Sequence, residues 1–429
     1  MQNGFNQGKM SVGATGSAYR EAGQSRPTSK LGDRLSNEDY DLVCLSHLRW
    51  DFVYQRPQHL LSRCASERRV FFIEEPIFDA ESPRLDSIQG TDNLTVIVPH
   101  LPAGLDEEAV DLALQKLVDT LFMEHAISEY VLWYYTPMAT TWTSHLEPLV
   151  VVYDCMDELS AFRDAPRRMK QQEAELFDRA NLVFTGGQSL YEAKRDQHPH
   201  VYAFPSSIDA AHFAHAREIK EDPVDQAKIP FPRLGFFGVI DERLDVELIV
   251  GVAEARPDWH IVMIGPVVKI DPASLPRSSN IHYLGSKSYA ELPSYIARWD
   301  VALLPFALNE STRFISPTKT PEYLAAGRPV VSTSIRDVVR PYGQQRLVRI
   351  ADTVTDFVAA VEAAMTEEDE GRIRRVDSFL AQNSWDRTWA RMRQLIENVI
   401  GATSISVPLA QAITSKRPAA GATGTLVAD

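Results

Sequence analysis

Short apolar runs alternate with amphipathic stretches along most of the 429-residue chain. In the first half these runs predict strands at 41–47, 69–76, 94–100, 130–137, 149–158, 181–187 and 200–205. Helical spacing is clearest at 107–125, and another helix is expected to start near Pro57. Continuously apolar strands between helices are typical of a parallel sheet that is covered on both faces. The pattern therefore predicts an α/β domain of the doubly wound, Rossmann-like type.

The alternation stops at 206–232, where charges are mixed and three prolines occur, and it then restarts. Further strands are predicted at 233–240, 260–266, 281–285, 300–305 and 347–350, with helices near 245–255 and 289–298. A chain of this length exceeds the size at which single cores stop growing. We therefore predict two doubly wound domains, at 39–208 and 209–383, with ligand sites at the carboxyl ends of the strands and in the cleft between the domains.

The two ends of the chain carry a different pattern. Residues 1–38 and 402–429 are rich in small and polar residues without periodicity, and we predict that both are disordered extensions. Between them and the second domain, large apolar residues recur at near-helical spacing in 384–401, which predicts an amphipathic final helix.

Charge and composition limit the classes of partner. A formal net charge of −14 argues against a protein that coats nucleic acid or a polybasic membrane protein. The start of the chain has no apolar signal core and no run is long enough to span a membrane, so a cytoplasmic location is expected. A basic cluster (Arg163, Arg167, Arg168, Lys170) favours a solvated helix face, with a peripheral contact at the inner face of the membrane left open. The three cysteines suit buried free thiols, and no spacing resembles a metal site.

One polar motif opens a predicted helix in the second half. In 316–333, SPTKTPEYLAAGRPVVST, the helix starts with either Ser316 or Thr320 as its cap, each followed by proline. Either start places Lys319 and Glu322 beside unpaired backbone N–H groups. A lysine opposes the helix dipole at that end unless a phosphate lies between them, and a glutamate can accept hydrogen bonds from both hydroxyls of a ribose. The alternative is a surface Lys–Glu pair worth about 0.5 kcal/mol or less.

Two glycines and an arginine add to this motif. Gly238 ends a predicted strand and leads through Arg243 into a helix, and Gly265 ends the next strand. Glycine permits close approach of the backbone to a ligand, and arginine can donate two hydrogen bonds to a phosphate. A plain tight turn explains the glycines equally well. No G-x-G-x-x-G fingerprint is present, so a nicotinamide cofactor is not indicated.

The pattern P-T-K-x-x-E-Y-L-A-A-G-x-P-V-V resembles the nucleotide-sugar motif of GT-B glycosyltransferases of family 4. In the first half, 46–65 and 151–162 resemble a branch that acts in bacterial surface-polysaccharide and teichuronic-acid-type assembly. The resemblance covers residues 39–400. It implies a cytoplasmic enzyme with two Rossmann-like domains, in which the final helix, 384–401, crosses back to the first domain.

The resemblance also implies the chemistry and the roles of single residues. It implies transfer from a UDP- or GDP-linked sugar to a saccharide or lipid-linked acceptor, with retention of configuration and without metal or cofactor. Glu322 would hold the ribose, and Arg243 and Lys319 would stabilise the leaving diphosphate. Backbone N–H groups around Pro317–Thr320, Thr318 among them, would bind its oxygens.

The sequence departs from the family pattern at several places. Phe314 stands eight positions before Glu322, near the place where the family often has a first glutamate close to the donor sugar. Arg243 stands without the lysine that often accompanies it. In the first domain, Asp154 and Asp157 follow a strand after which many members have a histidine.

The acceptor side is expected at the strand ends of the first domain. Asp154 and Asp157 are candidates there, and capping of the next helix is the equally weighted alternative. His47 ends the first strand at the same edge, with a structural role as its alternative. Trp50, Arg56 and His59 are weaker candidates, for which packing explains as much. Two other functions remain open: a nucleotide-sugar epimerase of the same fold and a non-catalytic protein that binds nucleotide sugars.

Overall fold

The computed structural model describes residues 40–91, 93–162 and 165–414, and the side chains of residue 369 and of 403–414 are not described. The predicted disordered extension 1–38 and the last part of the predicted tail, 415–429, lie outside the described residues. So does Arg163 of the basic cluster.

The first sheet has eight strands in the order β3-β4-β2-β1-β5-β6-β7-β8. Its strands are β1 (Asp41–Leu45), β2 (Val70–Ile73), β3 (Arg84–Thr91), β4 (Leu94–His100), β5 (Tyr130–Tyr134), β6 (Val150–Cys155), β7 (Leu182–Thr185) and β8 (Val201–Ala203). All neighbours pair in parallel except β3 and β4, which are antiparallel. Alternate residues of β1 enter different cores, with Leu42 and Cys44 on one face and Val43 and Leu45 on the other. Both faces are therefore apolar, as continuous apolar strands predict.

Helices cover both faces of this sheet. They are α1 (Arg56–Ala65), α2 (Glu107–Glu124), α3 (Thr140–Thr143), α4 (Met169–Arg179) and α5 (Gln188–Lys194). Short 3-10 turns lie at Pro137–Ala139 and Leu159–Ala161. The side chain of Asp106 caps α2 by accepting a hydrogen bond from the backbone N–H of Ala109 at 2.8 Å.

The second sheet has six parallel strands in the order β11-β10-β9-β12-β13-β14. They are β9 (Arg233–Phe237), β10 (His260–Ile264), β11 (Ile281–Tyr283), β12 (Val301–Leu304), β13 (Val330–Ser332) and β14 (Arg349–Ile350). The helices of this domain are α6 (Ala210–Ala214), α7 (Val246–Ala255), α8 (Leu292–Ile296), α9 (Lys319–Ala325), α10 (Arg336–Val338), α11 (Val354–Met365) and α12 (Asp369–Leu380). Short turns of 3-10 or π geometry lie at His215–Arg217, Pro272–Ser274, Tyr289–Glu291 and Val339–Gly343. The prediction of two doubly wound sheets is confirmed.

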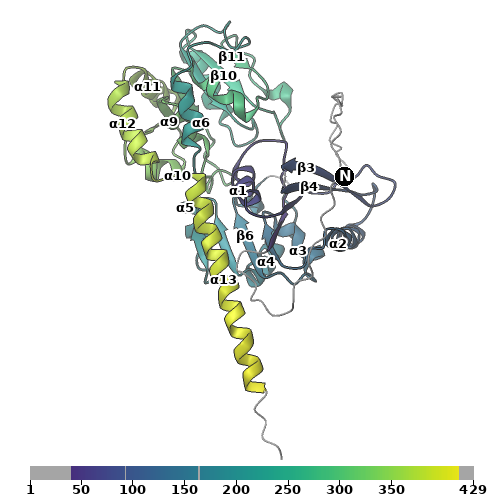
Figure 1. The fold of residues 1–429 in the computed structure, drawn as a ribbon. Helices are drawn as coiled ribbons and strands as arrows, with labels where there is room; N and C mark the ends of the chain where they lie inside the picture. The colour runs from purple at the N-terminus through teal and green to yellow at the C-terminus, as the bar shows by residue number, and fades with distance from the viewer. Residues whose placement is uncertain (1–39, 92, 163–164, 415–429) are drawn as a thin grey trace, which may run out of the picture. The chain divides into compact units, whose positions relative to one another are not determined.

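The final helix, α13 (Trp385–Thr414), returns to the first sheet (Figure 1). Its apolar face packs against β5 and β6 and joins their core through Trp385, Trp389, Met392 and Ile396. The predicted crossing of this helix to the first domain is confirmed. The helix continues past residue 401, where the sequence analysis places its end, to Thr414.

Direct contacts join the two domains near the strand ends. The Ser206 hydroxyl donates to the carbonyl of Ser316 at 2.6 Å, and Asp337 accepts from the backbone N–H of Ser189 at 3.0 Å. A Cβ atom on Gly187 would lie 2.3 Å from an oxygen of Asp337, so this approach requires glycine. Phe314 packs against the core of the first domain. The contacts of Ser316 and Phe314 hold the loop before α9 against the first domain, and the contact of Asp337 holds α10 against α5.

Candidate donor and acceptor site

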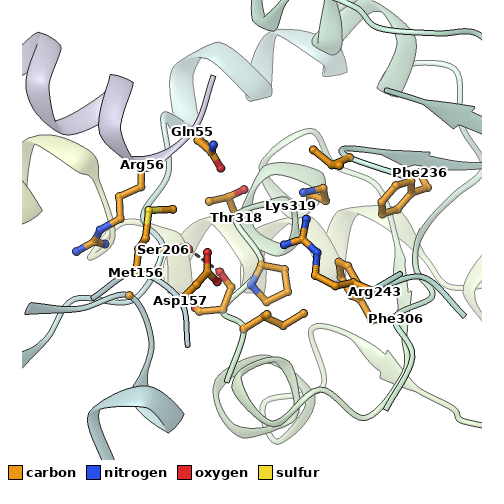
Figure 2. Close-up of a pocket in the computed structure, with 15 residues that line it drawn as sticks. Gln55, Arg56, Met156, Asp157, Ser206, Phe236, Arg243, Phe306, Thr318 and Lys319 are labelled. Carbon is orange, nitrogen blue, oxygen red and sulfur yellow. Dashed lines mark hydrogen bonds between the residues drawn. The ribbon is translucent and has the colours of Figure 1, made fainter. Parts of the chain in front are cut away.

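Two connected cavities lie between the strand ends of the two domains. The smaller one, of about 100 Å³, is drawn in Figure 2, and the larger one has a volume of about 370 Å³. The residues shared by both linings are Gln55, Val239, Arg243, Thr318 and Lys319. The cationic side chains of Arg243 and Lys319 therefore stand where the cavities meet.

Helix α9 starts at Lys319, and Thr318 precedes it with helical backbone angles. Neither predicted start is right, because Pro321 occupies the third position of the helix and no side chain caps it. The first turn of a helix has no internal acceptor for its N–H groups, so a proline there removes no hydrogen bond. Lys319 and Glu322 nevertheless both lie in the first turn, as predicted.

Glu322 is 5% exposed, and its Oε2 atom has no hydrogen-bond partner among the described residues. Burial raises the pKa of this carboxyl to about 7, against the opposing charge of Lys319. Burial also lowers the pKa of Lys319. The positive charge of Arg243 lowers this pKa further, whereas the negative charge of Glu322 raises it. The alternative of a surface Lys–Glu pair is wrong, because Glu322 is buried. Two ionisable groups left without a direct partner at a cavity wall are suited to a polar ligand.

The two predicted glycines make room for Lys319. Gly238 has a φ of +139°, and a Cβ atom there would lie 2.1 Å from Cε of Lys319. Gly265 has a φ of +140°, and a Cβ atom there would lie 1.9 Å from the carbonyl oxygen of Gly238. Any larger residue would displace the lysine or the turn. Both glycines line the larger cavity, so they serve the site as well as the turn.

Arg243 is held by Asp241, whose carboxylate accepts from Nε at 3.0 Å and from Nη2 at 2.7 Å. Asp241 is itself buried. This pairing fixes the guanidinium plane, and Nη1 of Arg243 makes no hydrogen bond with any described residue. Pro317 and Thr318 line the smaller cavity beside it.

Asp154 lies away from both cavities. It is 0% exposed, and its carboxylate accepts hydrogen bonds from Nε and Nη2 of Arg56 at 2.8–3.1 Å. Arg56 also donates to the carbonyl of Phe204 at 2.8 Å and forms part of the smaller cavity's wall. The geometry therefore gives Asp154 the role of holding Arg56, rather than that of an acceptor contact or a helix cap.

Asp157 lies on the first-domain wall of the smaller cavity, across from Arg243 and Lys319 (Figure 2). Its carboxylate accepts no hydrogen bond among the described residues, and burial raises its pKa against the charges of Arg243 and Arg56. The next residue, Glu158, pairs at 2.8 Å with buried Lys194. The loop that carries Asp157 is thus anchored while its carboxylate is left for the cavity.

His47 is in neither lining. Its Nδ1 atom lies 3.1 Å from the carbonyl oxygen of Tyr135, and burial lowers its pKa to about 4. The ring is therefore neutral at neutral pH, donates from Nδ1 to this carbonyl, and supports the structural alternative. Among the weaker candidates, Trp50 lines the larger cavity, and His59 stacks on Trp385 at 4.7 Å.

Several residues that line the cavities were not predicted from the sequence. Tyr54 and Tyr289 line the larger cavity from opposite domains, and Ser206 lines the smaller one. Their positions depend on how the two domains meet, for which no local pattern exists. Among the described residues, no group of three or more His, Cys, Asp or Glu could hold a metal ion. None of the helices in that part of the chain is long and apolar enough to span a bilayer.

Comparisons with known proteins show a resemblance to glycosyltransferases. Residues 232–367 match the family model "Glycosyl transferases group 1". A protein of Bacillus subtilis (strain 168) named as a teichuronic acid biosynthesis glycosyltransferase, TuaH, is 26% identical over 294 residues, which cover 63% of this chain and 72% of that protein. The predicted resemblance to this class and the prediction of a glycosyltransferase are confirmed.

Solved structures show the same fold at low sequence identity. Sucrose-phosphate synthase from Thermosynechococcus elongatus has a TM-score of 0.62 and 13% identity, and the match covers 85% of this chain and 100% of that one. HepE from Anabaena, in complex with UDP and glucose, has a TM-score of 0.59 and 13% identity, with 83% and 98% covered. The GT-B architecture is confirmed.

Proposed function

We propose that this chain, whose residues 232–367 match the glycosyltransferase group 1 family model, transfers a sugar from a nucleoside diphosphate sugar to a saccharide or lipid-linked acceptor. The observation that carries the proposal is the placement of Arg243 and Lys319 where two cavities meet, with the unpartnered carboxylate of Glu322 in the larger one. In a nucleoside diphosphate sugar, the diphosphate joins the nucleoside to the sugar. Two cations between two cavities suit such a ligand, because each cavity can hold one of the joined groups.

The cavities suggest how the donor lies. The nucleoside would occupy the larger cavity, with its ribose hydroxyls on Glu322, and the diphosphate would contact Arg243 and Lys319. The sugar would then enter the smaller cavity, beside Asp157. UDP is the favoured nucleotide of the two expected, because a protein of similar fold is held in complex with it.

Transfer would depend on charge stabilisation. As the bond between the sugar and the diphosphate breaks, negative charge grows on the leaving oxygen, and the two cations stabilise it in a site sheltered from water. We propose retention of configuration, with the acceptor hydroxyl attacking from the face that the diphosphate leaves and giving its proton to the departing phosphate. Asp157 lines the smaller cavity from the first domain, and there it would accept a hydrogen bond from a sugar hydroxyl.

The test is binding followed by turnover. Thermal unfolding is measured with UDP, GDP, ADP, TDP and CDP and with their sugars, since a ligand that binds the native state raises its apparent stability. Lys319→Met removes the cation but keeps the apolar stem, so we expect transfer to fall about 100-fold or more without loss of stability. Lys228→Met, which removes an exposed lysine outside both cavities, is the matched control.

The outcomes separate the other two functions. Isomerised sugar formed from donor alone would identify an epimerase. Binding without turnover across a broad acceptor panel would identify a non-catalytic protein. Failure of all five nucleotides to raise the unfolding temperature would overturn the proposal.

A further inference from the structure

The ring of Tyr289 is clamped at the wall of the larger cavity. His212 stacks on it with centroids 4.3 Å apart and an angle of 11°, and Tyr54 of the first domain stacks with centroids 4.4 Å apart at 26°. The Nε2 atom of His212 lies 3.0 Å from the carbonyl oxygen of Tyr289. Ring and backbone are therefore both fixed, which fixes the direction of the hydroxyl group.

That hydroxyl group is buried and has no hydrogen-bond partner among the described residues. The same holds for Oε2 of Glu322, which lines the same cavity. The two groups are near enough that, after burial, the charge of Glu322 is the next cause that raises the pKa of Tyr289. A buried polar atom without a partner costs about 1–3 kcal/mol. Two such atoms on one cavity wall indicate a ligand that supplies both partners.

The two groups offer complementary hydrogen bonds. An ionised carboxylate only accepts, whereas a phenol can donate. Each hydroxyl of a ribose both donates and accepts, so a ribose diol can donate to Glu322 and accept from Tyr289. A single sugar hydroxyl placed between them would satisfy both atoms.

We propose that Tyr289 is a second ribose-positioning residue, which acts with Glu322 and makes the chain select ribonucleotides over deoxyribonucleotides. This inference rests on the proposed function. It requires a donor whose nucleoside lies in the larger cavity, and it adds a residue from outside the motif that contains Glu322. Tyr54 and His212 act through Tyr289, by holding its ring.

The test compares Tyr289→Phe with the unaltered protein. Affinities for UDP, 2′-deoxy-UDP and 3′-deoxy-UDP are measured by calorimetry, with the GDP series run in parallel. We expect the variant to lose about three- to tenfold in affinity for the ribonucleotide and none for the deoxy form that lacks the hydroxyl contacted by Tyr289. Tyr283→Phe, which removes a phenol hydroxyl in β11 outside both cavities, is the matched control.

Unliganded stability separates this role from a structural one. Tyr289→Phe removes a hydroxyl without a partner, so the variant should unfold at the same or a higher temperature than the unaltered protein. Equal losses for the ribo and deoxy nucleotides, or no loss, would overturn the inference and leave the proposed function standing. If the unaltered protein binds no nucleotide of either series, the inference and the proposed function both fall.

Discussion

Both domains carry polar side chains near the two cavities, but the hydrogen bonds of these side chains differ. In the first domain, Asp154 is paired with Arg56, and His47 donates to a backbone carbonyl. In the second domain, Glu322 has an oxygen without a partner, and Lys319 forms no ion pair with any described residue. The side chains of Asp154 and His47 therefore form their hydrogen bonds within the protein. Those of Glu322 and Lys319 keep hydrogen-bonding groups that a ligand could use.

Burial and a raised pKa are not enough to tell a structural carboxylate from one that binds a ligand. Both Asp154 and Glu322 are buried carboxylates, and burial raises the pKa of each. Only the partners distinguish them, since Arg56 satisfies Asp154 from within the same domain. Asp157 is the exception in the first domain, because its carboxylate faces the smaller cavity without a hydrogen bond from a described residue.

The largest effect on the free energy of unfolding is expected from breaking the buried ion pair between Arg56 and Asp154. Arg56→Met leaves the carboxylate of Asp154 buried without its partner, which should cost about 3–5 kcal/mol of unfolding free energy, measured by urea titration. Adding Asp154→Leu removes the stranded charge and should restore much of the loss. Arg374→Met, which breaks an exposed pair with Glu370, is the control and should change little. An additive double variant would contradict this account of Asp154.

Most strands could be predicted because each contains a continuous apolar run, whereas β3 was missed because it is polar and mostly exposed. Within the site, Lys319, Glu322 and Gly238 could be found from one motif and one strand end. The pairing of Arg56 with Asp154 could not, because the two residues are 98 positions apart and meet only through the folded sheet. Tyr289 was missed for the same reason, since its partners come from both domains.

A smaller effect is expected in the pH dependence of stability, which depends on the unpartnered carboxylate of Glu322. The folded-state pKa of Glu322 is raised from 4.5 to about 7, so the folded protein binds more protons than the unfolded chain between these values. Its ionisation therefore lowers stability as pH rises through this window. Glu322→Gln should be more stable than the unaltered protein at pH 8 and equal to it at pH 4.

Urea titrations of both proteins across this pH range measure the difference. Asp157, whose pKa is also raised, contributes with the same sign to both proteins, so it cancels in the comparison. A constant difference at every pH would show that the pKa of Glu322 is not raised in the folded protein and would contradict this account of its burial.

The smallest effect is expected from removing the contact between Asp337 of the second domain and Ser189 of the first domain. Asp337 of the second domain accepts hydrogen bonds from the backbone N–H and the hydroxyl of Ser189 at the start of α5, so it caps a helix of the first domain. Asp337→Ala should cost about 1 kcal/mol of unfolding free energy, as loss of a helix cap does.

Asp352→Ala removes an acceptor of the N–H of Ser334 within the second domain and is the matched control. Because Asp337 joins α10 of the second domain to α5 of the first domain, only its variant should also raise the KM for the acceptor. Equal effects of the two substitutions on transfer would show that the smaller cavity does not depend on this contact.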